Sequence, residues 1–286
     1  MSGAEKDVKK MPENGSYYTI GEASQITHIS KKTLRFYEKI GLIQPDYVDQ
    51  ANGYRYYSRQ TLLMIPIIKY YKQMGFKLEE MRDNLASDSY AGHEESFLNK
   101  IGELRAMEQD IHVARRSVSD WYQLIVEANN VLINNAVEVS VKYQPSLTTC
   151  YLEQPFDNDY RAAIINIDWT NYLEDIGNAI TGPVMLYFPN VREKLEGRPT
   201  TACILQEILR SPGEHPTITV GGAMMISCYH IGCHDTIAKT YEKMYRWADR
   251  HGYQCADSSL ERYVTDYWTL NNEERFVTEV LIQAER

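Results

Sequence analysis

The sequence from residue 19 to residue 43 reads TIGEASQITHISKKTLRFYEKIGLI and predicts two short helices joined by a tight turn. Thr19 stands where it can cap the first helix, whose apolar residues recur at helical spacing. Ser30 can cap the second helix, and Gly41 can end it. The second helix begins with hydroxyl, cationic and aromatic side chains, which a helix in the DNA major groove requires. The segment is therefore a candidate helix-turn-helix.

A hairpin is predicted directly after these helices. Residues 43–58, IQPDYVDQANGYRYYS, contain the pair Asn52-Gly53, which is typical of tight hairpin turns, followed by a run of aromatic residues. A hairpin of this kind can lie along DNA phosphates as a wing. Helix, turn, helix and wing occurring together favour DNA binding over a purely structural role.

The charge of the chain is unevenly distributed. Residues 1–80 carry a net charge of +3, whereas the rest of the 286-residue chain carries −12. A basic N-terminal part followed by an acidic remainder is expected when one end of a protein binds a polyanion.

The composition argues against secretion, membrane insertion and a metal site. No apolar stretch approaches the roughly 20 residues that cross a bilayer, and residues 1–16 read as a disordered polar tail without the apolar core of a signal peptide. The five cysteines are scattered and form no Cys-x-x-Cys pair. We expect a cytoplasmic protein with no metal, cofactor or membrane partner.

Residues 94–132 predict one long helix, because they contain no proline and a single glycine. A helix of this length, about 55 Å, cannot bury an apolar stripe against itself. We expect it to pair with the same helix of a second copy; packing on the C-terminal domain of its own chain is the alternative. The stripe follows a heptad pattern that Glu108 and Arg115 interrupt, and consists of Phe97, Ile101, Leu104, Ile111, Val118, Tyr122 and Ile125.

These motifs resemble the MerR family of winged-helix transcription regulators. The resemblance rests on GEASQITHISKKTLRFYEKIGLIQP (21–45), NGYRYY (52–57) and MGFKLEEM (74–81). It implies a DNA-binding domain at 17–86, a linker and antiparallel coiled-coil helix at 87–132, and a homodimer on a pseudopalindromic promoter. The expected DNA-binding residues are Thr19, Lys31, Lys32, Thr33, Arg35, Phe36, Tyr37, Lys39, Gly53, Tyr54, Arg55 and Tyr56.

Two residues depart from the family pattern. Phe36 stands where the family usually has a second tyrosine, which puts a phosphate hydrogen bond in doubt at that position. Pro66, inside the helical run TLLMIPIIKYYKQMG, should kink that helix or remove one backbone hydrogen bond.

Residues 137–286 predict an independent α+β domain. The segment contains two weak repeats of strand, helix, strand and strand. The helices are predicted in WTNYLEDIGNAI and IAKTYEKMYRWADRHG. Two such repeats would form one antiparallel sheet with helices on one face.

This domain resembles the GyrI-like effector-binding domain, above all in HDTIAKTYEKMYRWADRHGY, LERYVTDYW and RFVTEVLI. The resemblance implies an aromatic cavity with a strand carboxylate at its base, which falls on Glu261, with Tyr263 on the same sheet face. The alternative for Glu261 is a surface carboxylate paired with Arg262 or Arg275. The expected ligand-binding residues are Tyr151, Tyr187, Tyr229, Glu261, Tyr263, Tyr267, Trp268 and Glu279.

A carboxylate among aromatic rings suits a lipophilic cation, which restores charge balance and gains cation–π attraction. We therefore expect a multidrug-responsive regulator that binds promoter DNA and a hydrophobic, cationic compound. The family resemblance implies activation by promoter distortion, with RNA polymerase as a partner. We expect no catalytic residues; a protein that only sequesters compounds, or a GyrI-like hydrolase of small electrophiles fused to a DNA-binding domain, is the alternative.

Overall fold

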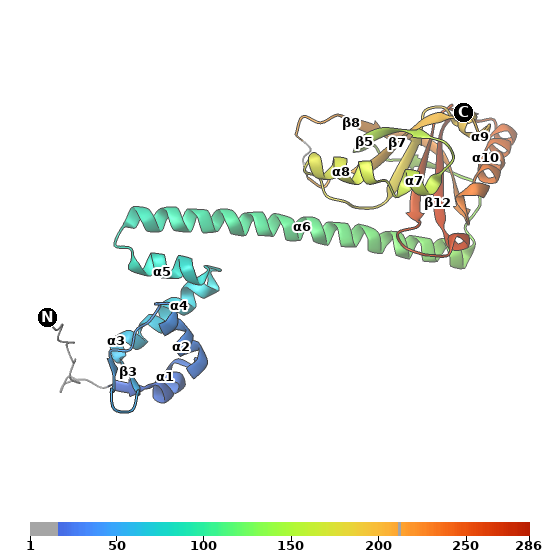
Figure 1. Ribbon diagram of the computed structural model, residues 1–286. Coiled ribbons are helices and arrows are strands. Elements are labelled where there is room, and N and C mark those ends of the chain that lie inside the picture. The colour runs from blue at the N-terminus through green and yellow to red at the C-terminus, as the bar shows by residue number, and fades with distance from the viewer. Residues whose placement is uncertain (1–16, 211–212) are drawn as a thin grey trace. The chain divides into compact units, whose positions relative to one another are not determined.

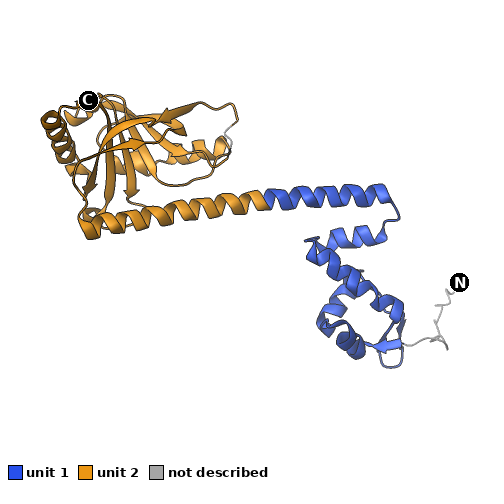
Figure 2. Cartoon of the chain, turned by 180° about the vertical axis from the view of Figure 1, so that it is seen from behind, with its two compact units in different colours: residues 1–107 blue, residues 108–286 orange. Residues whose placement is uncertain are grey.

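The computed structural model describes residues 17–210 and 213–286, so the tail predicted for residues 1–16 lies outside the described part. The chain divides into two compact units, residues 1–107 and 108–286 (Figure 2). The boundary falls inside one long helix, α6 (Tyr90–Asn134).

The first unit contains the predicted helix-turn-helix and hairpin (Figure 1). Thr19 caps α1 in a reciprocal arrangement with Glu22, and Ser30 caps α2, so both predicted caps are confirmed. The three strands form a small antiparallel sheet in the order β1-β3-β2. In chain order the elements before α6 are β1 (Tyr17–Thr19), α1 (Ile20–Thr27), α2 (Lys31–Lys39), β2 (Tyr47–Val48), β3 (Arg55–Ser58), α3 (Arg59–Leu62), α4 (Met64–Gln73) and α5 (Leu78–Ala86).

Pro66 accounts for the break between α3 and α4. It lies in the first turn of α4, and α3 ends at Leu62. In a continuous helix the Pro66 ring would clash with the carbonyl of Leu62, which would also lack its N–H partner. The predicted interruption is confirmed, and Ile65 and Ile68 still reach the core on either side of the proline.

Helix α6 presents three kinds of surface along its length. Near its start, Phe97 packs against Tyr71 and Phe76 of the first unit, with ring centroids 6.0 and 5.1 Å away. Near its end, Leu124, Ala128 and Val131 are buried in the second unit. The other six residues of the predicted stripe are all at least 44% exposed, namely Ile101, Leu104, Ile111, Val118, Tyr122 and Ile125. No described helix, α6 included, combines the length and apolarity that crossing a membrane requires.

The second unit is a nine-stranded antiparallel sheet with helices. Its path runs β4-β9-β12-β11-β6-β7-β5-β8, and β10 pairs with β12. The two predicted repeats are confirmed as β5-α8-β6-β7 and β9-α10-β11-β12, while the short helices α7 and α9 were not predicted. The elements are β4 (Ser140–Gln144), β5 (Leu147–Phe156), α7 (Tyr160–Ile164), α8 (Ile167–Asp175), β6 (Val184–Phe188), α9 (Val191–Leu195), β7 (Thr200–Glu207), β8 (Thr217–Val220), β9 (Ala223–Ile231), α10 (Ala238–His251), β10 (Gln254–Cys255), β11 (Ser259–Thr265) and β12 (Val277–Glu285).

The two repeats exchange their leading strands. Strand β4 precedes β5 in the chain but pairs with β9, and β8 precedes β9 but pairs with β5. The two crossings meet where Gly222 N–H donates to the Gln144 carbonyl at 2.8 Å. Gly221 has φ +81°, and a Cβ there would come within 2.2 Å of the Pro145 carbonyl oxygen, so the crossing requires glycine.

The sheet has two differently covered faces. We call the first the helix face: helices α7 to α10 pack on it, over a core that includes Leu186, Phe188 and Tyr263. We call the second the α6 face, because Val264 and Val277 on it pack against the end of α6. Side chains alternate between the faces along each strand, so neighbouring residues in the sequence have entirely different surroundings.

Candidate functional sites

The exposed side of α2 gathers cations in the first unit. Ser30 Oγ accepts a hydrogen bond from the Thr33 N–H at 3.0 Å and thereby fixes the start of the helix. Leu34 anchors the opposite side in the core. The exposed residues of α2 are Lys31, Lys32, Arg35, Phe36 and Lys39, and Thr33 is half-buried.

Tyr37 differs from its neighbours in the predicted DNA-binding set. It is 5% exposed and belongs to the core of the first unit, and burial raises the pKa of its hydroxyl. This burial argues against a direct contact with DNA, because helical periodicity places Tyr37 and Leu34 on the same side of α2.

The hairpin is tied to α2 by an ion pair. Gly53 has φ +70° in the turn, and Tyr54 beside it is 59% exposed. Arg55 Nε donates to Glu38 Oε2 on α2 at 2.7 Å. Tyr56 lies against Tyr47 of the neighbouring strand, with centroids 5.8 Å apart. The guanidinium of Arg55 is thus held between the helix and the wing.

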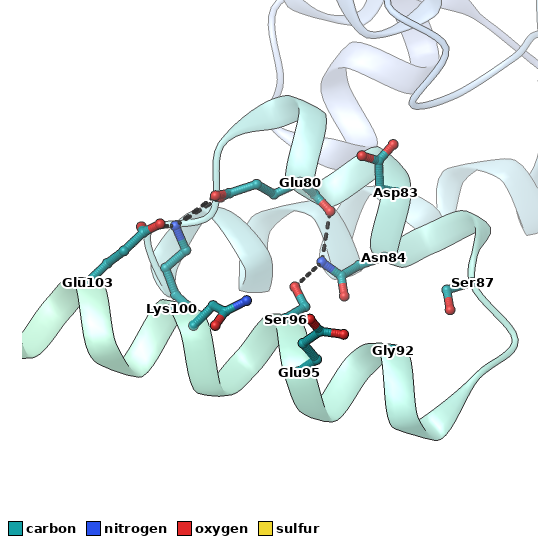
Figure 3. A pocket seen from close by; sticks show the side chains of 10 residues that line it. Glu80, Asp83, Asn84, Ser87, Gly92, Glu95, Ser96, Lys100 and Glu103 are labelled. Atoms are coloured by element: carbon teal, nitrogen blue, oxygen red, sulfur yellow. Dashed lines mark hydrogen bonds and ion pairs between the residues drawn. The ribbon is translucent and has the colours of Figure 1, made fainter.

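A groove between α5 and α6 holds a buried lysine (Figure 3). Lys100 is 5% exposed, and its ammonium contacts Glu80 at 2.9 Å and Glu103 at 2.6 Å. These hydrogen bonds raise the pKa of Lys100, with the Glu103 bond the largest cause. Asn84 also donates to Ser96 across the groove at 2.8 Å. These contacts attach α5 to the first turns of α6.

The predicted ligand-binding residues of the second unit do not form one site. Glu261 and Tyr263 lie on the helix face of β11, with Tyr267 just beyond the strand. Trp268 stacks on Trp121 of α6, with centroids 3.9 Å apart. The four remaining residues lie on the α6 face, namely Tyr151, Tyr187, Tyr229 and Glu279.

Glu261 is fully buried on the helix face, so its alternative reading as a surface carboxylate is wrong. Tyr241 on α10 donates its hydroxyl to Oε1 at 2.7 Å, and Tyr263 donates to Oε2 at 2.6 Å. Lys194 on α9 forms an ion pair with the same carboxylate. Burial, reinforced by the charge of Glu261, raises the pKa of both tyrosines well above 10, so both hydroxyls remain donors.

Aromatic rings enclose the Lys194 ammonium, which is itself in a buried residue. Its nitrogen lies 4.0 Å from the Phe188 ring centre, 4.6 Å from Tyr241 and 5.4 Å from Tyr160. Burial lowers the pKa of Lys194, and the carboxylate of Glu261 opposes that shift. We call Glu261, Lys194, Tyr263 and these rings the aromatic box. Its arrangement is that of a cation-binding site in which the protein supplies the cation.

His234 adds a neutral wall beside the box. It is 1% exposed, and its ring lies 5.2 Å from Tyr160 and 5.1 Å from Tyr263. Burial lowers the pKa of His234 to about 4, against a partial opposing effect of Glu261. Nε2 contacts Thr278 Oγ1 at 3.1 Å, whereas Nδ1 has no hydrogen-bond partner in the described residues.

Glu279, the second predicted acid, belongs to an ion network on the α6 face. Arg262 contacts it at 2.9 Å, Lys142 at 2.5 Å, and Ser227 donates to it at 2.6 Å. Arg262 also pairs with Glu127 of α6. Burial raises the pKa of Glu279, but Arg262 and Lys142 outweigh this and leave it lowered. The network fastens α6 to the sheet.

Sequence reasoning missed Lys194, Tyr241 and Tyr160. Lys194 lies in the short helix α9, which no periodic pattern in the sequence predicted. Among the described residues, no group of three or more His, Cys, Asp or Glu side chains could hold a metal ion. The five cysteines are free, and Cys228 is buried.

Comparisons with known proteins assign both parts of the chain. Residues 18–88 match the model of the MerR HTH family of regulatory proteins. Residues 138–285 match the model of the GyrI-like small molecule binding domain.

The two relatives named next each match about a third of this chain. The multidrug-efflux transporter 1 regulator of Bacillus subtilis is 38% identical over 107 residues, which is 35% of this chain and 38% of that protein. The transcriptional regulator CueR of Escherichia coli O157:H7 is 31% identical over 104 residues, 35% of this chain and 76% of CueR. A solved structure, an EcmrR–DNA complex in EcmrR-RPo, overlaps 94% of this chain and 100% of that chain at 22% identity, with a TM-score of 0.42.

Proposed function

Because the chain belongs to the MerR family of helix-turn-helix regulators and carries a GyrI-like small-molecule binding domain, we propose that it is a DNA-binding transcription regulator that responds to a hydrophobic, cationic compound. The aromatic box around Glu261 is the observation that carries the ligand class. The second unit binds the compound in this proposal and does not convert it.

The first step of the proposal is DNA binding through α2 and the wing. Lys31, Lys32 and Arg35 are exposed on one side of a capped helix whose other side is buried. Helix N-terminal donors and cations position a protein on phosphates and base edges. Arg55 and the exposed Tyr54 extend the surface along the backbone of the duplex.

The second step is dimerisation through α6. A stripe of exposed apolar residues on a 45-residue helix, even one that Glu108 and Arg115 interrupt, is unfavourable in water and suits a second copy of the same helix. An antiparallel pair would present two α2 helices to the half-sites of a pseudopalindromic promoter. RNA polymerase at that promoter is the partner on which the ligand-bound dimer acts, through distortion of the DNA.

The third step is cation exchange in the aromatic box. Lys194 balances the charge of Glu261 without a ligand. A lipophilic cation that replaces the ammonium keeps the carboxylate paired, restores contact with the rings and releases Lys194 to water. The exchange conserves the net charge of the box.

The DNA-binding step is tested by fluorescence anisotropy with a duplex that the purified protein selects from a random library. Arg35→Ala should weaken binding at least tenfold and reduce its salt dependence. Arg82→Ala, which removes an exposed cation of α5, is the matched control and should bind like the native protein. Equal affinities for the two variants would contradict the assignment of α2.

The ligand step is tested by calorimetric titration with tetraphenylphosphonium and with a neutral aromatic compound of similar shape. Glu261→Gln should lower the affinity for the cation at least tenfold and leave the affinity for the neutral compound nearly unchanged. Lys194→Met removes the competing ammonium and should raise the affinity for the cation. A native protein and a Lys194→Met variant that both fail to bind tetraphenylphosphonium would overturn cation exchange.

A further inference from the structure

A cavity lies in the second unit, and none of the residues of the aromatic box lines it. Its volume is about 280 Å³, and its walls come from α8, the end of β11 and helix α6. This is roughly twice the volume of a cavity that holds benzene, about 150 Å³, and therefore suits a two-ring compound.

The walls of the cavity are mainly apolar. Trp169 lines the cavity and is buried, and Trp121 of α6 and Trp268 stack as one aromatic surface. Apolar side chains also surround its opening: Ile165 is 51% exposed, Ile167 77% and Trp268 55%. Large apolar side chains left in water around a cavity are typical of a ligand-binding site.

One acidic side chain lines this cavity. Asp266 is 1% exposed, and its carboxylate accepts one hydrogen bond, from the Trp268 N–H at 2.8 Å. Within the described part of the chain, no cation forms an ion pair with it. Gln206, the nearby amide, is already satisfied by the Ala179 carbonyl at 2.7 Å and the Thr181 N–H at 2.9 Å. Burial raises the pKa of Asp266 to about 6, and the hydrogen bond from the Trp268 N–H opposes that shift.

We propose that this cavity binds a small aromatic amine, whose ring packs on the tryptophan and isoleucine walls and whose ammonium pairs with Asp266. The contrast with Glu261 decides the ligand: the box has a resident cation, whereas Asp266 has none. Because Trp121 belongs to α6, a compound bound here touches the same helix that carries the exposed stripe. The inference deepens the proposed function, since it adds a second ligand site to the same sensor domain.

The probe is 2-(aminomethyl)naphthalene, compared by calorimetry with 2-naphthalenemethanol, which has a hydroxyl in place of the amine. The native full-length protein should prefer the amine at pH 7.5. Asp266→Asn keeps the acceptor for the Trp268 N–H. It should lower the affinity for the amine at least tenfold and change the affinity for the alcohol less than threefold. Ile167→Arg, at an exposed position that tolerates a large side chain, should weaken the amine more than the alcohol. Asp175→Asn, at an exposed acid of α8 outside the cavity lining, is the matched control and should leave both affinities unchanged.

The outcomes separate this inference from cation exchange in the box. If the native protein binds tetraphenylphosphonium but not the amine, the second site is wrong and the proposed function stands. If the amine binds and depends on Asp266 while tetraphenylphosphonium does not bind, the second site stands and the exchange fails. An amine affinity that Asp266→Asn leaves intact overturns the role of the carboxylate.

Discussion

Glu261 and Glu279 are buried carboxylates on the neighbouring strands β11 and β12, yet they have opposite surroundings. Glu261 faces tyrosine hydroxyls, aromatic rings and one lysine from a five-residue helix. Glu279 faces Arg262, Lys142 and Ser227, and the same arginine reaches α6. One carboxylate is held by a single lysine among aromatic rings, and the other by a network that fastens two elements together. The type of residue does not separate the acid of the proposed ligand site from a structural acid; the sheet face does.

The largest expected effect is on the α6 face. Arg262→Met leaves Glu279 and Glu127 without their shared cation, and removing one partner of a buried ion pair costs about 3–5 kcal/mol. Urea unfolding of the variant should show a loss of this size, while the affinity for tetraphenylphosphonium of the protein that remains folded should be unchanged. A loss of stability below about 1 kcal/mol would contradict the structural role of the Arg262–Glu279 network.

A fall in pH should destabilise the second unit through His234, which lies on the helix face of the sheet. Its pKa is lowered to about 4 by burial, from an ordinary value of 6.5, so its contribution to stability is present above pH 6.5 and is lost as the pH falls from 6.5 through 4. The shift corresponds to about 3 kcal/mol. Denaturant unfolding measured between pH 7.5 and 4 should show this decline, and His234→Phe should flatten it. An unchanged pH profile in that variant would assign the decline to other groups.

Lys194→Met should cost about 3 kcal/mol in urea unfolding, the lower end for a broken buried ion pair, because Glu261 loses its counter-charge but keeps two tyrosine donors. Tetraphenylphosphonium should restore part of the lost stability, because a bound cation supplies the counter-charge that Glu261 has lost. A loss that the cation does not reduce would show that the box cannot exchange its resident cation.

The smallest expected effect belongs to a single donor. Tyr263→Phe removes one hydrogen bond to the Glu261 carboxylate and should cost about 1.5 kcal/mol in urea unfolding. Tyr172→Phe is the control, because the buried Tyr172 hydroxyl has no hydrogen-bond partner in the described residues and its removal should be neutral. Equal costs for the two variants would mean that the Tyr263 hydroxyl adds nothing specific to the box.

The elements of the fold follow from local signals, which act between residues close in the chain. A few neighbouring residues encode each of the caps at Thr19 and Ser30 and the break at Pro66. In the two repeats, each helix and strand shows its own short pattern in the sequence. Family resemblance located Glu261, and strand alternation placed Tyr263 beside it. These two members of the box could therefore be predicted from the sequence.

The rest of the box depends on contacts between distant segments. Lys194 meets Glu261 across 67 residues, and Tyr241 meets it across 20. The predicted aromatics Tyr151, Tyr187 and Tyr229 lie on the α6 face because the pairing register of their strands, which a single sequence does not reveal, sets their direction. The face on which a strand residue lies must be known before it is assigned to a pocket.

The exchange of β4 and β8 between the repeats bears on the ancestry of the second unit. Each repeat lends its leading strand to the other, which is the connectivity of two domain-swapped copies joined in one chain. A solitary ancestral repeat would have completed its sheet only in a dimer of identical halves. Two copies joined in one chain need not stay identical, and one sheet carries Lys194 on α9 of the first repeat and Glu261 on β11 of the second. The box therefore needs both repeats, because neither repeat alone contains the ion pair.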